Sequence, residues 1–233
     1  MAGKRLDPAR DRPFYAAGMH DFPAADPMPA EIEALRDSAQ PVWIFAYGSL
    51  MWDPEFPRAA SEPALLRGWH RSFCLYSSDY RRTRAQPGLT LGLDRGGACR
   101  GIAFRLRPET LAEALDLLWL REMTAPRVYD MRLLPVRIPG AIRRAFAFTV
   151  RRDHPDYAGR LSLDEAARII ATAAGRRGTC RAYLLGTLRH LDELGLVDKP
   201  LRQLGARVAA LARAPIGDKF RSGNLADSRE EDP

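Results

Sequence analysis

Hydrophobic positions between residues 41 and 150 mostly form short runs or alternate with polar positions, which is the pattern of β-strands. We expect strands at six places, which are residues 42–46, 64–76, 89–93, 101–106, 129–138 and 145–150. Gly68 predicts a bend in the second strand, whereas the glycine-rich segment at residues 94–98 is typical of a turn between the third and the fourth. Pro139-Gly140 predicts the turn that joins the last two.

Apolar residues recur at helical spacing after Glu109 and again through the last third of the patterned region. Ser162 and Glu165 form a capping box, so we expect a helix to begin there. Two further helices are predicted at residues 179–194 and from Pro200 onward. Consecutive strands followed by a group of helices predict an α+β fold around a barrel or a curled sheet.

Composition divides the chain into three parts. Residues 1–40 contain several prolines, few branched aliphatic residues and mixed charge, so we expect a partly disordered N-terminal extension with one helix near residues 30–38. Residues 41–215 hold the strand and helix patterns and are the predicted folded domain. Residues 216–233 have no hydrophobic periodicity, which predicts a disordered tail.

Composition also limits the class of protein and its compartment. Hydrophobic residues make up 46% of the 233 residues, but no apolar run approaches the roughly 20 residues of a membrane-spanning helix. The N-terminus lacks the apolar stretch of a secretory signal. Three isolated cysteines (Cys74, Cys99 and Cys180) argue against a disulfide framework or a zinc site and favour reduced thiols in the cytoplasm. Because the four histidines are scattered, we expect no metal site.

The net charge of +7 allows two interpretations. It arises from 36 lysines and arginines against 29 acidic residues, a balance that suits attraction of nucleic acid or of a small anionic substrate. Because the basic residues are spread along the chain, we expect a solubilising surface and neither a nucleic acid nor a membrane as partner. A basic, non-catalytic binding or regulatory module stays open as an alternative of a different class. The sequence does not indicate an oligomeric state.

A glutamate interrupts the apolar face of the helix predicted after Glu109. That face consists of Leu111, Ala114, Leu115, Leu118 and Trp119. At about 3.6 residues per turn, Glu122 lies only about 20° from Leu111 around the helix axis. A buried carboxylate at the negative end of a helix has a raised pKa, which suits a general base near neutral pH. Alternatively, the helix ends before Glu122 and leaves the side chain in water.

The first predicted strand ends in Tyr47-Gly48-Ser49-Leu50. Successive backbone N–H groups and the Ser49 hydroxyl are suitable donors for a developing oxyanion, and Gly48 permits close approach of a ligand. Taken alone, the same four residues are typical of an ordinary turn. Beside a buried carboxylate at Glu122, the turn becomes one wall of a candidate catalytic pocket.

Several short motifs follow one another along the chain. They are Tyr47-Gly48-Ser49-Leu50 with Trp52, Arg67-Gly68-Trp69-His70-Arg71 with Phe73, Asp79-Tyr80-Arg81 with Pro87-Gly88, Arg121-Glu122 with Tyr129, Asp156-Tyr157, and Tyr183-Leu184. Together, over roughly residues 42–211, they resemble the ChaC-like glutathione-specific γ-glutamylcyclotransferases. A single Y-G-S-L motif is weak evidence, whereas its ordered co-occurrence with the others is specific. Ala46, Arg82 and residues 124–130 depart from the family pattern, at the rim of the pocket.

The resemblance implies a fold, a reaction and a set of site residues. The family has a small mixed β-barrel flanked by helices, and its members cleave glutathione into 5-oxoproline and cysteinylglycine by an intramolecular aminolysis that needs no cofactor. The position that matches the family's proton acceptor is Glu122. The resemblance assigns substrate binding to the strand and its turn, which are Ile44, Phe45, Ala46, Tyr47, Gly48, Ser49 and Leu50.

Four tyrosines and one arginine complete the candidate site. Tyr47, Tyr129, Tyr157 and Tyr183 either line the pocket or belong to the core. Arg81 either pairs with a carboxylate of glutathione or lies at the surface. Within the same chemistry, the alternative is a cyclotransferase that acts on other γ-glutamyl amino acids or amines.

Overall fold

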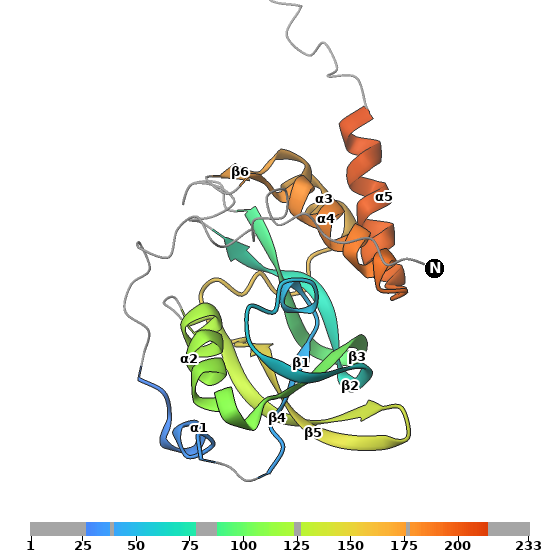
Figure 1. The fold of residues 1–233 in the computed structure, drawn as a ribbon. Helices are drawn as coiled ribbons and strands as arrows, with labels where there is room; N and C mark the ends of the chain where they lie inside the picture. The colour runs from blue at the N-terminus through green and yellow to red at the C-terminus, as the bar shows by residue number, and fades with distance from the viewer. Residues whose placement is uncertain (1–26, 38–39, 78–87, 124–126, 176–177, 214–233) are drawn as a thin grey trace, which may run out of the picture.

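The computed structural model describes residues 27–37, 40–77, 88–123, 127–175 and 178–213. These residues form a closed barrel of strands with helices packed around it (Figure 1). The strands are β1 Trp43–Ala46, β2 Arg58–Ser77, β3 Gly88–Leu106, β4 Tyr129–Ile138 and β5 Ala141–Val150. Their order around the barrel is β1-β3-β2-β4-β5. Because β1 and β5 pair in parallel and the other pairs are antiparallel, the predicted small mixed barrel of an α+β fold is confirmed.

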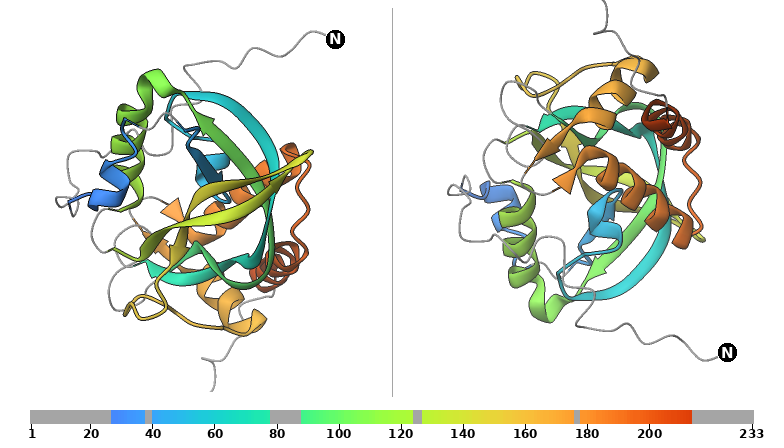
Figure 2. Two further views of the ribbon diagram at one scale, coloured as in Figure 1. Left: turned by 90° about the horizontal axis from the view of Figure 1, so that it is seen from below. Right: turned by 90° about the horizontal axis from the view of Figure 1, so that it is seen from above.

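The helices lie in two groups on different sides of the barrel (Figure 2). One group contains α1 Ala30–Glu33 and α2 Leu111–Glu122, which follows the 3₁₀ turn η2 Pro108–Thr110. The other contains α3 Leu163–Thr172, α4 Cys180–Glu193 and α5 Lys199–Arg213, with the short strands β6 Ala174–Gly175 and β7 Gly178–Thr179. A further 3₁₀ turn, η1 Ser49–Met51, follows β1. Within the described residues, no helix is long and apolar enough to cross a membrane.

The predicted helix starts are largely confirmed. Ser162 and Glu165 form the capping box of α3, with the Ser162 hydroxyl accepting from the Glu165 N–H at 3.2 Å and the Glu165 carboxylate accepting from the Ser162 N–H at 2.8 Å. The helix predicted near residues 30–38 is the short α1, and its Ile32 is buried in the core beside α2. Residues 1–26 and the tail predicted at 216–233 lie outside the described residues.

Glycines bend the β2–β3 hairpin. Gly68 has a φ of 82°, and the pairing of β2 with β3 shifts register at this point, which confirms the predicted bend. The turn predicted at residues 94–98 is wrong, because β3 runs through this segment without reversing. Gly96 and Gly97, with φ values of 108° and 65°, form the matching irregularity on β3. Glycine reaches such angles without steric conflict, so both strands bend at the same point and continue.

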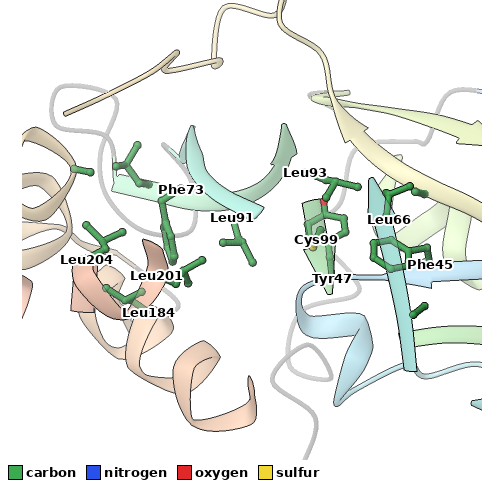
Figure 3. Packing of buried hydrophobic residues seen from close by; sticks show 14 of the residues in the cluster. Phe45, Tyr47, Leu66, Phe73, Leu91, Leu93, Cys99, Leu184, Leu201 and Leu204 are labelled. Atoms are coloured by element: carbon green, nitrogen blue, oxygen red, sulfur yellow. The ribbon is translucent and has the colours of Figure 1, made fainter. Parts of the chain in front are cut away.

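β1 is buried on both faces, and its side chains belong to two core clusters. Phe45 belongs to a cluster that also contains Leu66, Leu93 and residues of α3, α4 and α5, and Figure 3 shows Phe45 next to Leu66. Ile44 and Ala46 point into a second cluster, which β1 and β5 share with α2. This burial fixes the position at which β1 ends and the Y-G-S-L turn begins.

Gly101 on β3 allows the end of β1 to lie close against β3. A Cβ atom at this position would lie 2.2 Å from the Ala46 carbonyl oxygen and 2.9 Å from the ring of Phe45. Only a residue without a side chain fits here, because backbone atoms cannot move aside as a flexible side chain can. The lack of a side chain at Gly101 therefore allows the end of β1 to lie against β3.

Arg71 on β2 anchors the same end of β1. Its Nε donates to the Tyr47 carbonyl oxygen at 2.5 Å, and its Nη2 donates to the Arg100 carbonyl oxygen at 2.6 Å. Its Nη1 pairs with Asp198 at 2.7 Å, and Asp198 in turn accepts from the Leu201 N–H in the first turn of α5 at 3.1 Å. The Arg71 side chain is only 2% exposed, so these partners, rather than water, stabilise its positive charge. Arg71 ties the turn after β1 to β3 and α5.

Replacing Arg71 by methionine would remove these bonds and leave Asp198 without its cation. We expect Arg71→Met to lower the free energy of unfolding by about 3–5 kcal/mol, the usual cost of breaking a buried ion pair. Urea denaturation followed by circular dichroism measures this change. Arg202→Met is the matched control, because Arg202 pairs with Asp192 at the surface, where such a pair contributes about 1 kcal/mol or less. Equal losses in the two variants would contradict the anchoring role.

Candidate active site

The Y-G-S-L turn leads from β1 into η1. The Met51 N–H donates the first hydrogen bond of η1, to the Gly48 carbonyl oxygen at 2.9 Å. The N–H groups of Ser49 and Leu50 precede this bond, so they lie at the amino end of the helical turn. N–H groups at that position have no partner within the helix and carry a partial positive charge. These two N–H groups are the predicted donors for an oxyanion, and their contact with one stays a prediction.

The fold does not require a glycine at position 48. Its φ of −128° lies outside the left-handed region that favours glycine, so this angle does not require a missing side chain. A Cβ atom at Gly48 would lie 3.5 Å from Leu91, which is an ordinary contact. A side chain is therefore tolerated by the fold, and the predicted close approach of a substrate to Gly48 stays a prediction.

Glu122 is the last residue of α2, and the helix does not end before it. The Met123 N–H donates to the Trp119 carbonyl oxygen at 2.9 Å, so the last turn of the helix is intact. The Glu122 side chain is only 16% exposed, as its place on the apolar face of the helix predicts. Burial raises the pKa of Glu122, and the neighbouring Arg121 opposes that rise. The alternative in which the helix ends early and leaves Glu122 in water is wrong.

Arg121 joins Glu122 to the Y-G-S-L turn. Its Nε lies 3.3 Å from Glu122 Oε1, and its Nη2 donates to Ser49 Oγ at 3.1 Å. Its Nη1 donates to the Asp53 carbonyl oxygen at 2.7 Å and to Glu55 Oε2 at 2.8 Å. The Arg121 side chain is 10% exposed, so these contacts form largely away from bulk water. One guanidinium thus brings the two predicted parts of the site, the carboxylate and the turn, into one network.

Sequence reasoning placed Arg121 in a motif but gave it no role in the site. Its contact with Ser49 joins residues 72 positions apart, and its contact with Glu55 joins residues 66 positions apart. Hydrophobic periodicity does not reveal such pairs, because it reports only which face of an element is buried. The available signal was a permanent cation next to a carboxylate predicted to be buried.

Three of the four predicted tyrosines lie near one another, and two of them, Tyr47 and Tyr129, interact with Glu122. The three are Tyr47 at the end of β1, Tyr129 on β4 and Tyr183 on α4, and each interacts electrostatically with the other two. The Tyr129 hydroxyl donates to the Leu91 carbonyl oxygen at 3.0 Å. Burial raises the pKa of Tyr47 and of Tyr129 well above the usual value, and the negative charge of Glu122 adds to both shifts. These two hydroxyls therefore stay protonated at neutral pH.

Tyr157 belongs to a different polar cluster. Its hydroxyl donates to Asp94 Oδ2 at 2.9 Å, and the buried Asp94 also accepts from Arg152 Nε at 2.7 Å. Burial and then the hydrogen bond to Asp94 raise the pKa of Tyr157 to about 12. Sequence reasoning missed Asp94 because it assigned this residue to a turn. Contact of Tyr157 with a substrate stays a prediction.

The other predicted substrate residues lie in the core or outside the described residues. Ile44, Phe45 and Ala46 are fully buried, and Leu50 packs into the cluster beside α2. Their side chains hold the strand and its turn in place, and their contact with a substrate stays a prediction. Arg81 lies outside the described residues.

An open groove of about 690 Å³ lies at the other end of α2. It is lined by Gln40, Pro41, Val42, Ala59 and residues 105–111. The axis of α2 rises roughly 17 Å between Leu111 and Glu122, so this groove is separate from the candidate active site.

The chain is similar to known proteins over most of its length. A family model described as ChaC-like protein matches residues 42–211. The glutathione-specific γ-glutamylcyclotransferase of Escherichia coli (strain K12) is 39% identical over 192 residues, which are 82% of this chain and 81% of that protein. The glutathione-specific γ-glutamylcyclotransferase 1 of Rattus norvegicus is 31% identical over 169 residues, which are 70% of this chain and 76% of that protein.

A solved structure has the same fold. The crystal structure of a γ-glutamylcyclotransferase specific to glutathione from yeast matches with a TM-score of 0.66 at 19% identity, over 74% of this chain and 100% of that chain. At this identity, the likeness shows the fold alone. The family model and the Escherichia coli relative confirm the resemblance that the ordered motifs predicted. The chain belongs to the ChaC-like protein family.

Proposed function

We propose that this chain is a glutathione-specific γ-glutamylcyclotransferase, a lyase that cleaves glutathione into 5-oxoproline and cysteinylglycine. The relatives from Escherichia coli and Rattus norvegicus carry that name. The observation that carries the proposal is the network in which Arg121 joins Glu122 to Ser49. This network combines a poorly solvated proton acceptor with the donors of the Y-G-S-L turn.

The reaction is an intramolecular aminolysis. The α-amino nitrogen of the γ-glutamyl group attacks its own γ-carbonyl carbon, and the new C–N bond closes a five-membered lactam. The γ-amide C–N bond then breaks. The attacking nitrogen loses one proton and the departing amine of cysteinylglycine gains one, so the reaction balances without a further reagent. Holding the two ends of the γ-glutamyl group together supplies part of the about 7–11 kcal/mol available from favourable orientation.

Glu122 is the proposed carrier of that proton. Because burial raises the pKa of Glu122, its carboxylate binds a proton more readily than an exposed carboxylate does. The same group then donates the proton to the departing nitrogen. Glu122 must be ionised to begin the cycle, so activity falls as the pH decreases through its pKa.

The Y-G-S-L turn is the proposed oxyanion site. The N–H groups of Ser49 and Leu50 lie at the amino end of η1, where they can stabilise the negative charge that develops on the γ-carbonyl oxygen. The Ser49 hydroxyl accepts a hydrogen bond from Arg121, and a hydroxyl that accepts can still donate its own proton. The protonated Tyr47 supplies a further donor near Glu122, whereas the Tyr129 hydroxyl already donates to the Leu91 carbonyl oxygen.

The charge and the cysteines of the chain fit this reaction. Glutathione is an anion, so a net charge of +7 favours its capture, and Arg81 is the proposed partner of one of its carboxylates. Cys74, Cys99 and Cys180 are buried free thiols, which suits a reducing compartment, and we place the reaction in the cytoplasm. A non-catalytic module is less well supported, because it predicts a solvent-exposed Glu122 with no link to the turn.

Glu122→Gln tests the proposed base, because it keeps the shape of the side chain and removes its charge. We expect the rate of 5-oxoproline formation from glutathione to fall by about 10²–10⁴-fold, the usual contribution of a general base. The thermal unfolding temperature and the affinity for glutathione should change little. Glu113→Gln is the matched control, because Glu113 lies exposed on the other face of α2. Turnover by Glu122→Gln close to that of Glu113→Gln would contradict the assigned role.

A comparison of substrates tests the proposed specificity. The purified protein is incubated with glutathione and, separately, with γ-glutamyl-alanine, and 5-oxoproline is measured by chromatography. We expect product from glutathione and much less from γ-glutamyl-alanine, since the turn and Glu122 act on the γ-glutamyl group while the rest of the pocket selects the leaving dipeptide. Product from γ-glutamyl-alanine alone would favour the alternative substrate class and overturn the assignment to glutathione.

A further inference from the structure

Glu55 has an unfavourable backbone conformation next to the candidate site. Its φ of 50° is the one positive value among the described residues other than glycine. A residue with a side chain adopts this conformation only where the surrounding structure imposes it, and such residues gather at functional sites. Glu55 lies in the segment at residues 53–57 that follows η1, and its carboxylate meets Arg121 at 2.8 Å.

Arg121 therefore forms ion pairs with two carboxylates, those of Glu55 and Glu122. Its Nη1 lies 2.8 Å from Glu55 Oε2, and its Nε lies 3.3 Å from Glu122 Oε1. Glu55 is 33% exposed and Glu122 is 16% exposed, so the carboxylate with the shorter contact is also the better solvated one. One positive charge is shared between two negative charges in a site with little water. The negative charge of Glu55 offsets part of the stabilisation that Arg121 gives to the ionised Glu122.

We propose that Arg121 is the positioning residue that holds Glu122 beside the Ser49 turn, and that Glu55 competes with Glu122 for the Arg121 charge. The two contacts of Arg121 with Ser49 and the Asp53 carbonyl oxygen fix the guanidinium, so both carboxylates orient on a rigid cation. The proposal rests on the proposed function for its catalytic meaning, because Glu122 is assigned there as the proton acceptor.

Among the described residues, the charged and titratable groups that interact with Glu122 are Arg121 on α2, Glu55 after η1, Tyr47 at the end of β1 and Tyr129 on β4. Asp53 interacts with Arg121 and Glu55, and Tyr183 on α4 interacts with the two tyrosines. Tyr47 and Tyr129 stay neutral near pH 7, because burial raises the pKa of each well above the usual value. Among the described residues, the charges that act on the pKa of Glu122 in this range are those of Arg121 and Glu55.

The two partners of Glu122 act in opposite directions. Burial raises the pKa of Glu122, Arg121 lowers it, and the negative charge of Glu55 raises it. Glu55→Gln removes this negative charge and therefore lowers the pKa of Glu122. Removing the charge of Arg121 raises it. Opposite shifts from two residues that contact each other are not expected from a general loosening of the site.

The test is a titration of the Glu122 side-chain carboxyl by ¹³C NMR in the full-length protein. Glutamate is labelled at the side-chain carboxyl carbon, and the Glu122 signal is assigned by its absence in Glu122→Gln. We expect the pKa of Glu122 to fall in Glu55→Gln and to rise in Arg121→Met. In Glu55→Gln, the acid limb of the plot of kcat/KM against pH should move to lower pH together with the NMR value. Shifts in the same direction, or no shift in Glu55→Gln, would overturn the proposal.

Two further variants separate charge from position. Glu113→Gln removes one negative charge from the exposed face of α2 and should leave the pKa of Glu122 unchanged. Arg121→Lys keeps the charge but loses the fork to Ser49, so we expect a pKa of Glu122 close to that of the native protein and a lower kcat. An unchanged kcat in Arg121→Lys would contradict the positioning role. If Arg121→Met does not fold, Glu55→Gln and Arg121→Lys still decide the two claims.

Failure of this proposal is distinguishable from failure of the proposed function. The NMR titration reports the pKa of Glu122 whether or not Glu122 is a catalytic residue. Full turnover by Glu122→Gln would remove the catalytic role and leave the charge competition intact. A Glu122 pKa that does not respond to Glu55→Gln would remove the competition and leave the base in place.

Discussion

The candidate site depends on the polar contacts of one guanidinium. Arg121 contacts Ser49 at 3.1 Å and Glu122 at 3.3 Å, and it thereby joins a turn at the end of β1 to the last residue of α2. A reaction in which one group removes a proton while another stabilises an oxyanion requires the two groups at a fixed separation. Arginine suits this task because its planar fork donates in several directions and keeps its charge at every physiological pH.

The barrel fixes the position of the Y-G-S-L turn, which Arg121 joins to the end of α2. β1 is buried on both faces, Gly101 lets β3 lie against its last residue, and Arg71 holds the Tyr47 carbonyl oxygen. Arg71 is itself held by Asp198 at the start of α5, so the late helices also support the turn. The apolar face of α2 positions Glu122 through the same packing that forms the second core cluster. Both halves of the site therefore rest on rigid elements.

Local patterns predicted most of the elements but few of the contacts between them. The strands, the capping box at Ser162 and the buried face that includes Glu122 follow from periodicity and from side-chain chemistry within a few residues. The segment at residues 94–98 was assigned wrongly as a turn, because a glycine pair in a bent strand has the same composition as a turn. The roles of Arg121 and Asp94 depend on partners more than 60 positions away, which no local pattern contains. The ordered motifs predicted the family, and the family model confirms it.

The most direct measurement of the central claim is a crystal structure of Glu122→Gln with glutathione bound. The account predicts the α-amino nitrogen of glutathione at hydrogen-bond distance, about 3 Å, from the side chain at position 122. It also predicts the γ-carbonyl oxygen facing the N–H groups of Ser49 and Leu50, with Arg121 still bridging from Ser49 toward position 122. Glutathione bound elsewhere, for example in the groove at the start of α2, or with its γ-carbonyl oxygen turned away from the turn, would contradict the account.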